Sequence, residues 1–271
     1  MDLFQALILG IVQGLTEYIP VSSSGHLVLV PWLLGWPDAP FTFEVLVQWG
    51  TLVGVFIYFW HDIGEIVQGV IRGLIKGQPF GTFEARLGWL VVIATVPAVL
   101  FGLLFKDFFE SFFSAPIYVG VLIGIASIIL VIAERLGSRQ RELESIDWLD
   151  ALVIGLWQVI TLVPGVSRSG ATITGGMVRG FNRPAAARFS FLMSIPALGG
   201  AGVVALKDLL ESGNLMAELP ALTVGFVAAA ISGYFCIRWL LGYLQGHSLY
   251  AFAAYRVILS VIVIIVALLR G

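Results

Sequence analysis

Residues 13–26 (QGLTEYIPVSSSGH) carry side chains able to perform acid–base and nucleophilic chemistry, although the chain on either side of them is apolar. Glu17 offers a carboxylate and His26 an imidazole, and hydroxyls come from Ser22, Ser23 and Ser24. Gln13 precedes Glu17 by four residues, so on a helix both side chains lie on one face. Such polar groups in an apolar region indicate a functional site.

The same residues predict where the local helix ends. Pro20 has no amide hydrogen and pushes Ile19 out of the α-helical conformation, so the first helix must end near Tyr18. The three serines follow as N-cap candidates for a second short helix, with His26 in its first turn. We therefore expect a broken helix, with the carboxylate before the break and the hydroxyls and imidazole after it.

A second polar break is predicted at residues 164–172 (PGVSRSGAT), and it repeats the first. With an offset of 145, the residues Gly10, Gln13, Thr16, Val21, Ser22, Ser24 and Gly25 fall on Gly155, Gln158, Thr161, Val166, Ser167, Ser169 and Gly170. The copies differ at three positions of chemical interest, where Glu17, Ser23 and His26 face Leu162, Arg168 and Ala171. One copy keeps the acid and the imidazole, and the other has the guanidinium.

Arg168 allows two interpretations. A charge at the centre of a bilayer costs on the order of 3 kcal/mol, so an unpaired arginine is not expected there. Arg168 and Glu17 could form a buried ion pair that locks the two copies together. Alternatively, two helix N-termini, hydroxyls and a guanidinium form a site for phosphate or diphosphate. Glu17 and Gln13 could then hold a hard divalent cation such as Mg²⁺.

The composition indicates the environment of these breaks. The chain has 271 residues, of which 59% are hydrophobic and 12% charged, and its mean hydropathy is +0.98. Soluble domains are about 25% charged, so we expect a polytopic membrane protein. A net charge of −2 without a basic run gives no sign of nucleic-acid binding. The single cysteine, Cys236, excludes an internal disulfide.

Hydropathy along the chain predicts an all-α polytopic membrane protein. The segments before and after each break are shorter than the roughly 20 residues that cross a bilayer, so each pair is predicted to form a re-entrant hairpin. About six transmembrane helices are expected, at residues 43–60, 89–105, 117–133, 184–206, 220–242 and 251–269, and residues 61–88 are expected to form a polar connection. The chain is one membrane domain, with repeat 1 at about 1–140 and repeat 2 at about 145–271.

Three spans separate the two hairpins, so the hairpins should enter from opposite faces, as in an inverted-topology repeat. The connections at 61–88 and 134–148 each hold three Lys or Arg residues, whereas those at 106–116 and 207–219 each hold one. The positive-inside rule then places the first two connections in the cytoplasm. Both termini and the mouth of the first hairpin would face outward.

The sequence resembles the undecaprenyl-diphosphate phosphatase family, also called bacitracin-resistance proteins, over nearly its whole length. The first signature is Gln13-x-x-x-Glu17 followed by residues 20–26 (PVSSSGH), and the second is residues 164–172. Weaker support comes from residues 43–51, 94–98 and 187–197 and from the pair Tyr255-Arg256. Many family members have Glu where this chain has Gln13, which leaves open whether position 13 contributes charge to a metal site.

The resemblance implies hydrolysis of undecaprenyl diphosphate to the monophosphate, which recycles the carrier lipid of cell-wall synthesis. It also implies a divalent cation, Mg²⁺ or Ca²⁺, and a bacterial plasma membrane. By position, Gln13 and Glu17 would serve the metal or water, and Arg168 would bind phosphate. The remaining active-site groups would be Ser23, His26, Ser167 and Thr172. The hydroxyls of Ser22, Ser24 and Ser169 are further candidates for phosphate binding. The oligomeric state is left open, a dimer being one option.

Three nucleophiles remain open from the sequence. Ser23 could attack with Glu17 or His26 as base, His26 could attack directly, or metal-bound water could do so. Ser23 is the preferred candidate. The main rival function is a secondary transporter or flippase of a phosphorylated lipid or anion, because such proteins also use inverted repeats with broken helices. A structural scaffold would leave Glu17 and Arg168 unexplained.

Overall fold

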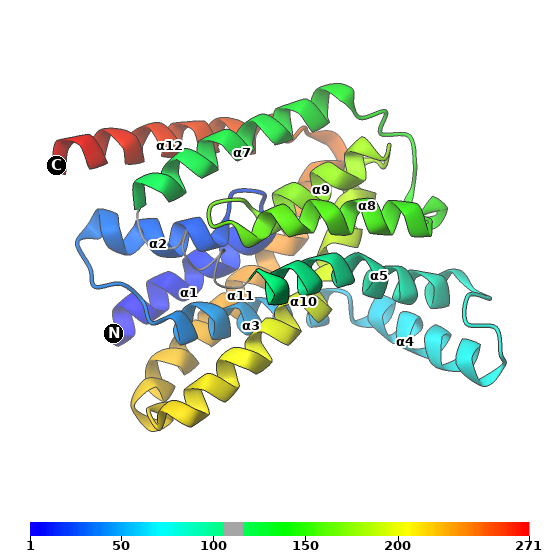
Figure 1. Ribbon diagram of the computed structural model, residues 1–271, viewed down its shortest axis with the longest axis horizontal. Coiled ribbons are helices and arrows are strands. Elements are labelled where there is room, and N and C mark those ends of the chain that lie inside the picture. Colours follow the sequence, from blue (N-terminus) through cyan, green and yellow to red (C-terminus); the bar gives the residue numbers. More distant parts are fainter. Residues whose placement is uncertain (106–115, 271) are drawn as a thin grey trace.

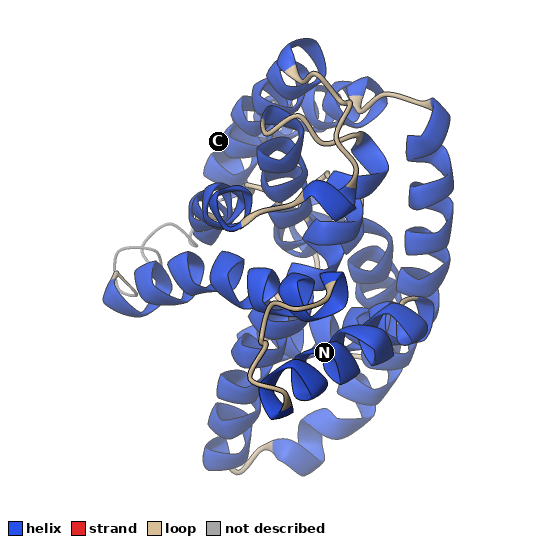
Figure 2. Cartoon of the chain, turned by 90° about the vertical axis from the view of Figure 1, so that its right-hand side faces the viewer, coloured by secondary structure: helices blue, strands red, loops and turns tan. Residues whose placement is uncertain are grey.

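The computed structural model describes residues 1–105 and 116–270, and in these ranges the chain is helical throughout, without a strand (Figures 1 and 2). Six helices are long and apolar enough to cross a membrane: α3 (Phe41–Tyr58), α5 (Phe83–Leu104), α7 (Pro116–Leu136), α10 (Arg183–Ser212), α11 (Leu215–Gly246) and α12 (Tyr250–Arg270). They confirm the six predicted spans and the all-α polytopic membrane fold. The predicted connection at 106–116 lies almost wholly outside the described residues.

Four shorter helices form the two predicted breaks. The first pair is α1 (Leu3–Tyr18) with α2 (Ser23–Leu34), and the second is α8 (Trp148–Val159) with α9 (Arg168–Val178). A short 3₁₀ turn, η2 (Ile160–Leu162), follows α8, and another, η1 (Leu143–Ser145), precedes it. The first helix ends at Tyr18, and Ile19 is extended with a ψ of 136°. The helix end predicted from Pro20 is therefore confirmed.

The two pairs enter the molecule from opposite ends (Figure 1). The N-terminus and the α2–α3 connection lie at the left of that view, whereas the connections from α7 to α8 and from α9 to α10 lie at the right. Equivalent glycines make equivalent contacts, because a side chain at Gly10 of α1 would collide with Gly225 of α11, and one at Gly155 of α8 would collide with Ala94 of α5. This symmetry fits the predicted repeat, whose inverted membrane topology stays a prediction.

The prediction of a polar connection at residues 61–88 was wrong in its form. Most of that range is an amphipathic helix, α4 (Trp60–Ile75), and its last residues begin α5. Apolar residues recur every three or four positions, as a helix requires; they are Ile63, Ile66, Val67, Val70, Ile71 and Leu74. No residue of α4 is buried, so the helix lies on the outside of the bundle.

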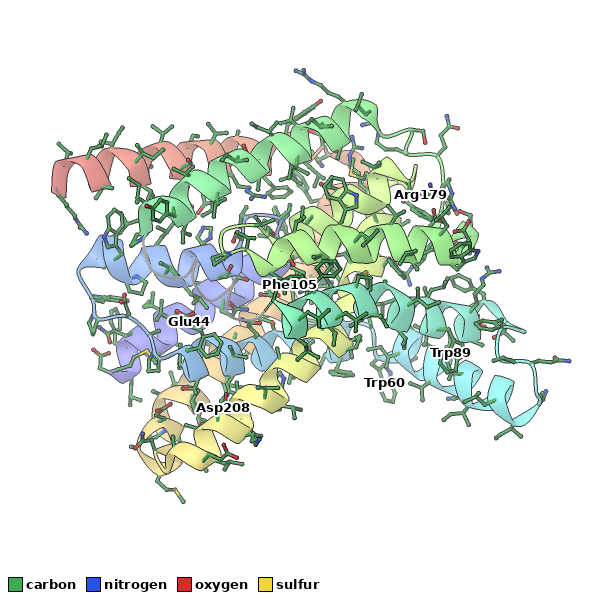
Figure 3. The ribbon with its side chains drawn as sticks, viewed as in Figure 1. Glu44, Trp60, Trp89, Phe105, Arg179 and Asp208 are labelled. Atoms are coloured by element: carbon green, nitrogen blue, oxygen red, sulfur yellow. The ribbon has the colours of Figure 1, made fainter. Side chains whose placement is uncertain are left out.

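Ion pairs hold the second hairpin at the right-hand end of Figure 1. The carboxylate of Asp150, in the first turn of α8, binds Arg141 at 2.6 Å and the Nε of Arg179 at 2.6 Å. Figure 3 shows Arg179 at this end of the molecule. The hydrogen bonds to Asp150 raise the pKa of Arg141 above its ordinary value. The connection before α8 is thus fastened to the end of α9, which fixes the base of the hairpin.

Candidate active site

The two breaks meet at Glu17, which is buried at the end of α1. Its Oε1 accepts a hydrogen bond of 2.7 Å from Nη2 of Arg168, in the first turn of α9. Its Oε2 accepts hydrogen bonds from Nε2 of Gln13 at 2.7 Å and from Oγ of Ser23 at 2.6 Å. One carboxylate therefore joins the guanidinium of the second copy to the amide and hydroxyl of the first.

The ion pair considered from the sequence is formed, yet it does not satisfy the groups around it. Among the described residues, Oε1 of Gln13 and Nε of Arg168 are both buried without a hydrogen-bond partner. Leaving such atoms unpaired costs about 1–3 kcal/mol each, so native proteins rarely keep them without a ligand or water. One is an acceptor and the other a donor, on either side of Glu17. The ion pair and a phosphate site can therefore exist together. The pair leaves Nε of Arg168 as a donor and Oε1 of Gln13 as an acceptor for a ligand.

Serines cap both short helices, as the repeat predicts. Ser22 is the N-cap of α2, and its Oγ accepts from the amide of Gly25 at 3.3 Å. Ser167 is the N-cap of α9, and its Oγ accepts from the amide of Gly170 at 3.1 Å. The positive ends of the two helix dipoles therefore both lie at the breaks, which favours an anion there.

The remaining predicted hydroxyls lie on both sides of the junction. Ser169 donates to the carbonyl of Ile19 at 3.2 Å, so the second break touches the first directly. Ser24 is partly exposed, and its Oγ lies 3.4 Å from that of Ser22. The hydroxyl of Thr172 donates to the carbonyl of Arg168 at 2.8 Å and lies 2.6 Å from Oγ of Ser190, whose carbonyl accepts from Nη1 of Arg168 at 3.5 Å. Thr172 thus supports the first turn of α9.

His26 is buried and does not hydrogen-bond to Ser23 or Glu17. Its Nδ1 lies 2.7 Å from the carbonyl oxygen of Ser22, and its Nε2 lies 2.7 Å from the hydroxyl of Tyr255 on α12. Of the two bases considered for Ser23, the structure places Glu17 on the hydroxyl, at 2.6 Å.

Three residues near the site had no role in the sequence-based prediction: Ser190, Tyr255 and Arg256. Arg256 is buried, and it donates to the carbonyls of Ile123 at 3.2 Å and Gly165 at 3.3 Å. No carboxylate among the described residues pairs with it, so a full positive charge lies behind the second break. The stretches that contain these residues supported the family resemblance, but nothing in their spacing connects them to the breaks.

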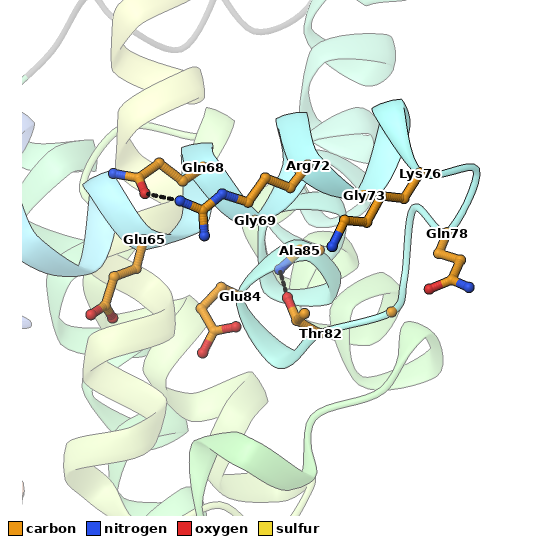
Figure 4. A pocket seen from close by; sticks show the side chains of 11 residues that line it. Glu65, Gln68, Gly69, Arg72, Gly73, Lys76, Gln78, Thr82, Glu84 and Ala85 are labelled. Atoms are coloured by element: carbon orange, nitrogen blue, oxygen red, sulfur yellow. Dashed lines mark hydrogen bonds between the residues drawn. The ribbon is translucent and has the colours of Figure 1, made fainter.

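A cavity of about 420 Å³ lies elsewhere, between α4 and α5 (Figure 4). Its walls include Glu65, Arg72, Lys76 and Glu84, and Gln68 accepts a hydrogen bond from Arg72. Arg72 is exposed at the surface of the molecule, in contrast to the buried, unpartnered atoms beside Glu17. We therefore place the candidate site at the two breaks and not in this cavity.

The oxygen atoms at the junction fit a divalent cation in part. Glu17 and Oε1 of Gln13 are hard oxygen ligands of the kind that Mg²⁺ and Ca²⁺ prefer. No group of three or more His, Cys, Asp or Glu side chains suited to a metal occurs in the described part of the chain. A cation here would therefore have to share its coordination with oxygens of a bound phosphate, as Mg²⁺ commonly does.

The fold and the site define an integral-membrane protein whose two helix breaks meet at a buried cluster of Glu17, Ser23 and Arg168. The family model for "Bacitracin resistance protein BacA" matches residues 6–262, and the chain belongs to this family.

Curated relatives agree with this assignment. A protein of Chlorobaculum tepidum is 46% identical over 96% of this chain and 95% of its own length. One of Thermomicrobium roseum is 43% identical over 98% of both chains. One of Myxococcus xanthus is 43% identical over 98% of this chain and 89% of its own. All three are named undecaprenyl-diphosphatase.

Proposed function

We propose that this protein is an integral-membrane phosphatase that hydrolyses undecaprenyl diphosphate to undecaprenyl phosphate and inorganic phosphate, and so recycles a carrier lipid of cell-wall synthesis. The observation that carries the proposal is the Glu17 carboxylate, which binds a hydroxyl and a guanidinium at once. The family to which the chain belongs, and the name of its relatives, support this choice of lipid.

In this mechanism Ser23 is the nucleophile and Glu17 its base. Oε2 of Glu17 takes the proton of the Ser23 hydroxyl as Oγ attacks the terminal phosphorus. The bond between that phosphorus and the bridging oxygen breaks, and the lipid monophosphate leaves. Water then attacks the phosphoserine and loses one proton, Glu17 returns its proton to Oγ of Ser23 as the bond to phosphorus breaks, and inorganic phosphate is released.

Arg168 binds the terminal phosphate. Its Nε has no partner among the described residues and its Nη2 is shared with Glu17, so the guanidinium has donors left for two phosphate oxygens. The amides of the first turns of α2 and α9 add partial positive charge that is already oriented before the reaction. Together they stabilise the negative charge of the transition state.

A divalent cation, Mg²⁺ or Ca²⁺, would be held by Oε1 of Gln13, Glu17 and the diphosphate itself. When bound, it would neutralise phosphate oxygens and so assist departure of the lipid monophosphate. Gln13 keeps Glu17 in place through its amide hydrogen in either case.

The site is proposed to face the outer side of a bacterial plasma membrane. Lys and Arg residues gather at the right-hand end of Figure 1, where the chain connects α4 to α5, α7 to α8 and α9 to α10; they include Lys76, Arg139, Arg141, Arg179 and Arg183. By the positive-inside rule this end is cytoplasmic. The α1–α2 hairpin, which carries Ser23 and Glu17, enters from the other end.

A buried site suits a lipid that remains in its membrane. Extracting a long isoprenoid tail into water would cost about 0.8 kcal/mol per CH₂ group, so the enzyme must reach the headgroup inside the bilayer. A transporter of phosphorylated lipids would also need Arg168. It would have no use for a hydroxyl held 2.6 Å from a carboxylate.

Phosphate release by the purified protein tests the proposal. Farnesyl and undecaprenyl diphosphates are supplied in detergent with Mg²⁺ or Ca²⁺, and a parallel sample contains EDTA. We expect inorganic phosphate from both lipids with metal and none with the chelator. If the folded protein releases no phosphate but moves labelled lipid across vesicles, the transporter interpretation replaces this one.

A further inference from the structure

Both ring nitrogens of His26 already have partners, so neither is free to meet a ligand. Nδ1 lies 2.7 Å from the Ser22 carbonyl oxygen, and Nε2 lies 2.7 Å from the Tyr255 hydroxyl. A carbonyl oxygen only accepts hydrogen bonds, so Nδ1 must carry a hydrogen. In the neutral ring Nε2 is then the acceptor, and the Tyr255 hydroxyl donates to it.

The surroundings of the two side chains differ. His26 is only 6% exposed, whereas Tyr255 is 44% exposed. The two rings are nearly parallel, with an angle of 7° and centroids 5.7 Å apart, so the hydroxyl points at Nε2 edge to edge. Any proton that His26 gives or takes at Nε2 must therefore pass through the hydroxyl of Tyr255.

We infer that Tyr255 is a further catalytic residue, whose hydroxyl relays a proton between His26 and the departing lipid phosphate. This inference rests on the proposed phosphatase function. It assigns His26 a role separate from Ser23 and Glu17, with which it makes no hydrogen bond among the described residues.

The protons balance in this step. When the negatively charged diphosphate binds, His26 takes up a second proton, at Nε2, so this hydrogen bond reverses and Nε2–H donates to Tyr255. As the bond from the terminal phosphorus to the bridging oxygen breaks, Tyr255 gives its proton to the leaving phosphate, and His26 replaces it. The proton of Ser23 goes separately to Glu17. In the second step Glu17 returns its proton to Oγ of Ser23, and one proton of the attacking water passes through Tyr255 to His26.

The relay also joins the two halves of the protein. His26 belongs to α2 in the first half, whereas Tyr255 belongs to α12 near the end of the chain. A purely structural contact could hold α12 in place equally well. The experiment must therefore separate a chemical role of the hydroxyl from a packing role.

Tyr255→Phe removes only the hydroxyl and keeps the ring. Phosphate release from farnesyl diphosphate is measured for this variant, for His26→Asn and for the double variant, with kcat and KM determined separately. Asn at position 26 still offers an amide donor for the Ser22 carbonyl, but lacks Nε2. Tyr250→Phe is the matched control, because Tyr250 is on the same helix and similarly exposed, at 42%. Thermal unfolding in detergent checks that each variant is folded.

We expect Tyr255→Phe to lower kcat about 10- to 100-fold with KM within about twofold, because general acid catalysis contributes on the order of 10²–10⁴. The double variant should be no slower than His26→Asn, since both changes interrupt one path. The relay is refuted if folded Tyr255→Phe turns over like Tyr250→Phe, or if the two losses multiply. Absence of turnover in the wild type would instead refute the proposed function.

Discussion

The two hairpins solve the same backbone problem with different residues. At the second break the left-handed conformation falls on a glycine, Gly165, with a φ of 85°, and the N-cap Ser167 has an ordinary φ of −62°. At the first break it falls on the N-cap itself, Ser22, with a φ of 77°. A residue with a Cβ is disfavoured in this region, whereas glycine is not.

The strained break is the one that carries the proposed nucleophile. Ser22 directly precedes Ser23, and its carbonyl accepts from His26. Strain of about 1–3 kcal/mol at a single residue persists only when the surrounding structure enforces it, and it is concentrated at functional sites. The relaxed break contributes Arg168, the group proposed to bind phosphate. The two copies therefore differ in their proposed roles. The first carries the reacting groups, and the second carries the phosphate-binding group.

The paired glutamines show the same division. Gln13 donates to Glu17 and keeps one unpartnered acceptor. Its counterpart Gln158 is equally buried, but both its amide oxygen and its amide nitrogen lack partners among the described residues. Leu162 stands where a second carboxylate would be. An acid in only one copy makes the junction asymmetric, which fits the proposal of a single catalytic centre.

The largest loss of activity should come from changing the first break, which carries the proposed nucleophile. Ser23→Ala removes the proposed nucleophile, and we expect phosphate release to fall at least about 10³-fold, because loss of a nucleophilic serine is among the costliest changes in hydrolases. Ser24→Ala is the matched control and should lose less than about tenfold. Substantial turnover by Ser23→Ala would transfer the attack to His26 or water.

The next largest loss of activity should come from changing Arg168 at the second break. Arg168→Ala removes the guanidinium and leaves Glu17 buried without its ion pair, so we expect kcat/KM to fall about 10²- to 10³-fold. Arg188→Ala is the control, because Arg188 pairs with Asp62 at 2.7 Å on an exposed surface. Equal losses in both variants would show that Arg168 has only a structural role.

Position 13 tests the asymmetry of the glutamines. Gln13→Glu adds a carboxylate beside Glu17, so we expect half-maximal activity at a cation concentration lower by about tenfold, as a second negative ligand attracts a divalent ion. Gln158→Glu, the same change in the other copy, should leave this concentration unchanged. Titration with Mg²⁺ and Ca²⁺ measures both variants. An unchanged requirement in Gln13→Glu would place the cation elsewhere.

The smallest effects concern the backbone and are measured as stability. Gly165→Ala puts a Cβ at a positive φ, next to the carbonyl of Val119, and should destabilise the protein by about 1–3 kcal/mol. Ser22→Gly relieves strain and loses only the cap, so its free energy of unfolding should change by less than about 1 kcal/mol. Thermal unfolding in detergent compares the two. Destabilisation by Ser22→Gly as large as by Gly165→Ala would show that the first break is not strained.

Local features of the fold and site were predictable from the sequence. Pro20 fixed the end of α1, the serine pattern identified the caps of α2 and α9, and the repeat brought Arg168 to Glu17. Each of these follows from neighbouring residues or from comparing one copy with the other. Hydropathy likewise located the six long helices.

Contacts between distant helices were not predictable. Tyr255 and His26 are 229 residues apart in the sequence, and nothing in the residue spacing of α12 predicts their contact. Ser190 meets Thr172 through the packing of α10 on α9, which depends on side-chain shapes along both helices. The helix α4 differs, because the apolar residues between its charges recur at helical spacing and are sufficient to predict it.

The ion pair between Glu17 and Arg168 has a consequence for biosynthesis. The chain is made from its N-terminus, so Glu17 enters the membrane while its partner, 151 positions later, has not been synthesised. The first half therefore cannot complete the junction at Glu17 until the second half, with Arg168, has been inserted. A chain that ends before Arg168 lacks the partner of Glu17, so we expect such a fragment to have no phosphatase activity. Activity would therefore be found only in chains that extend past the second break.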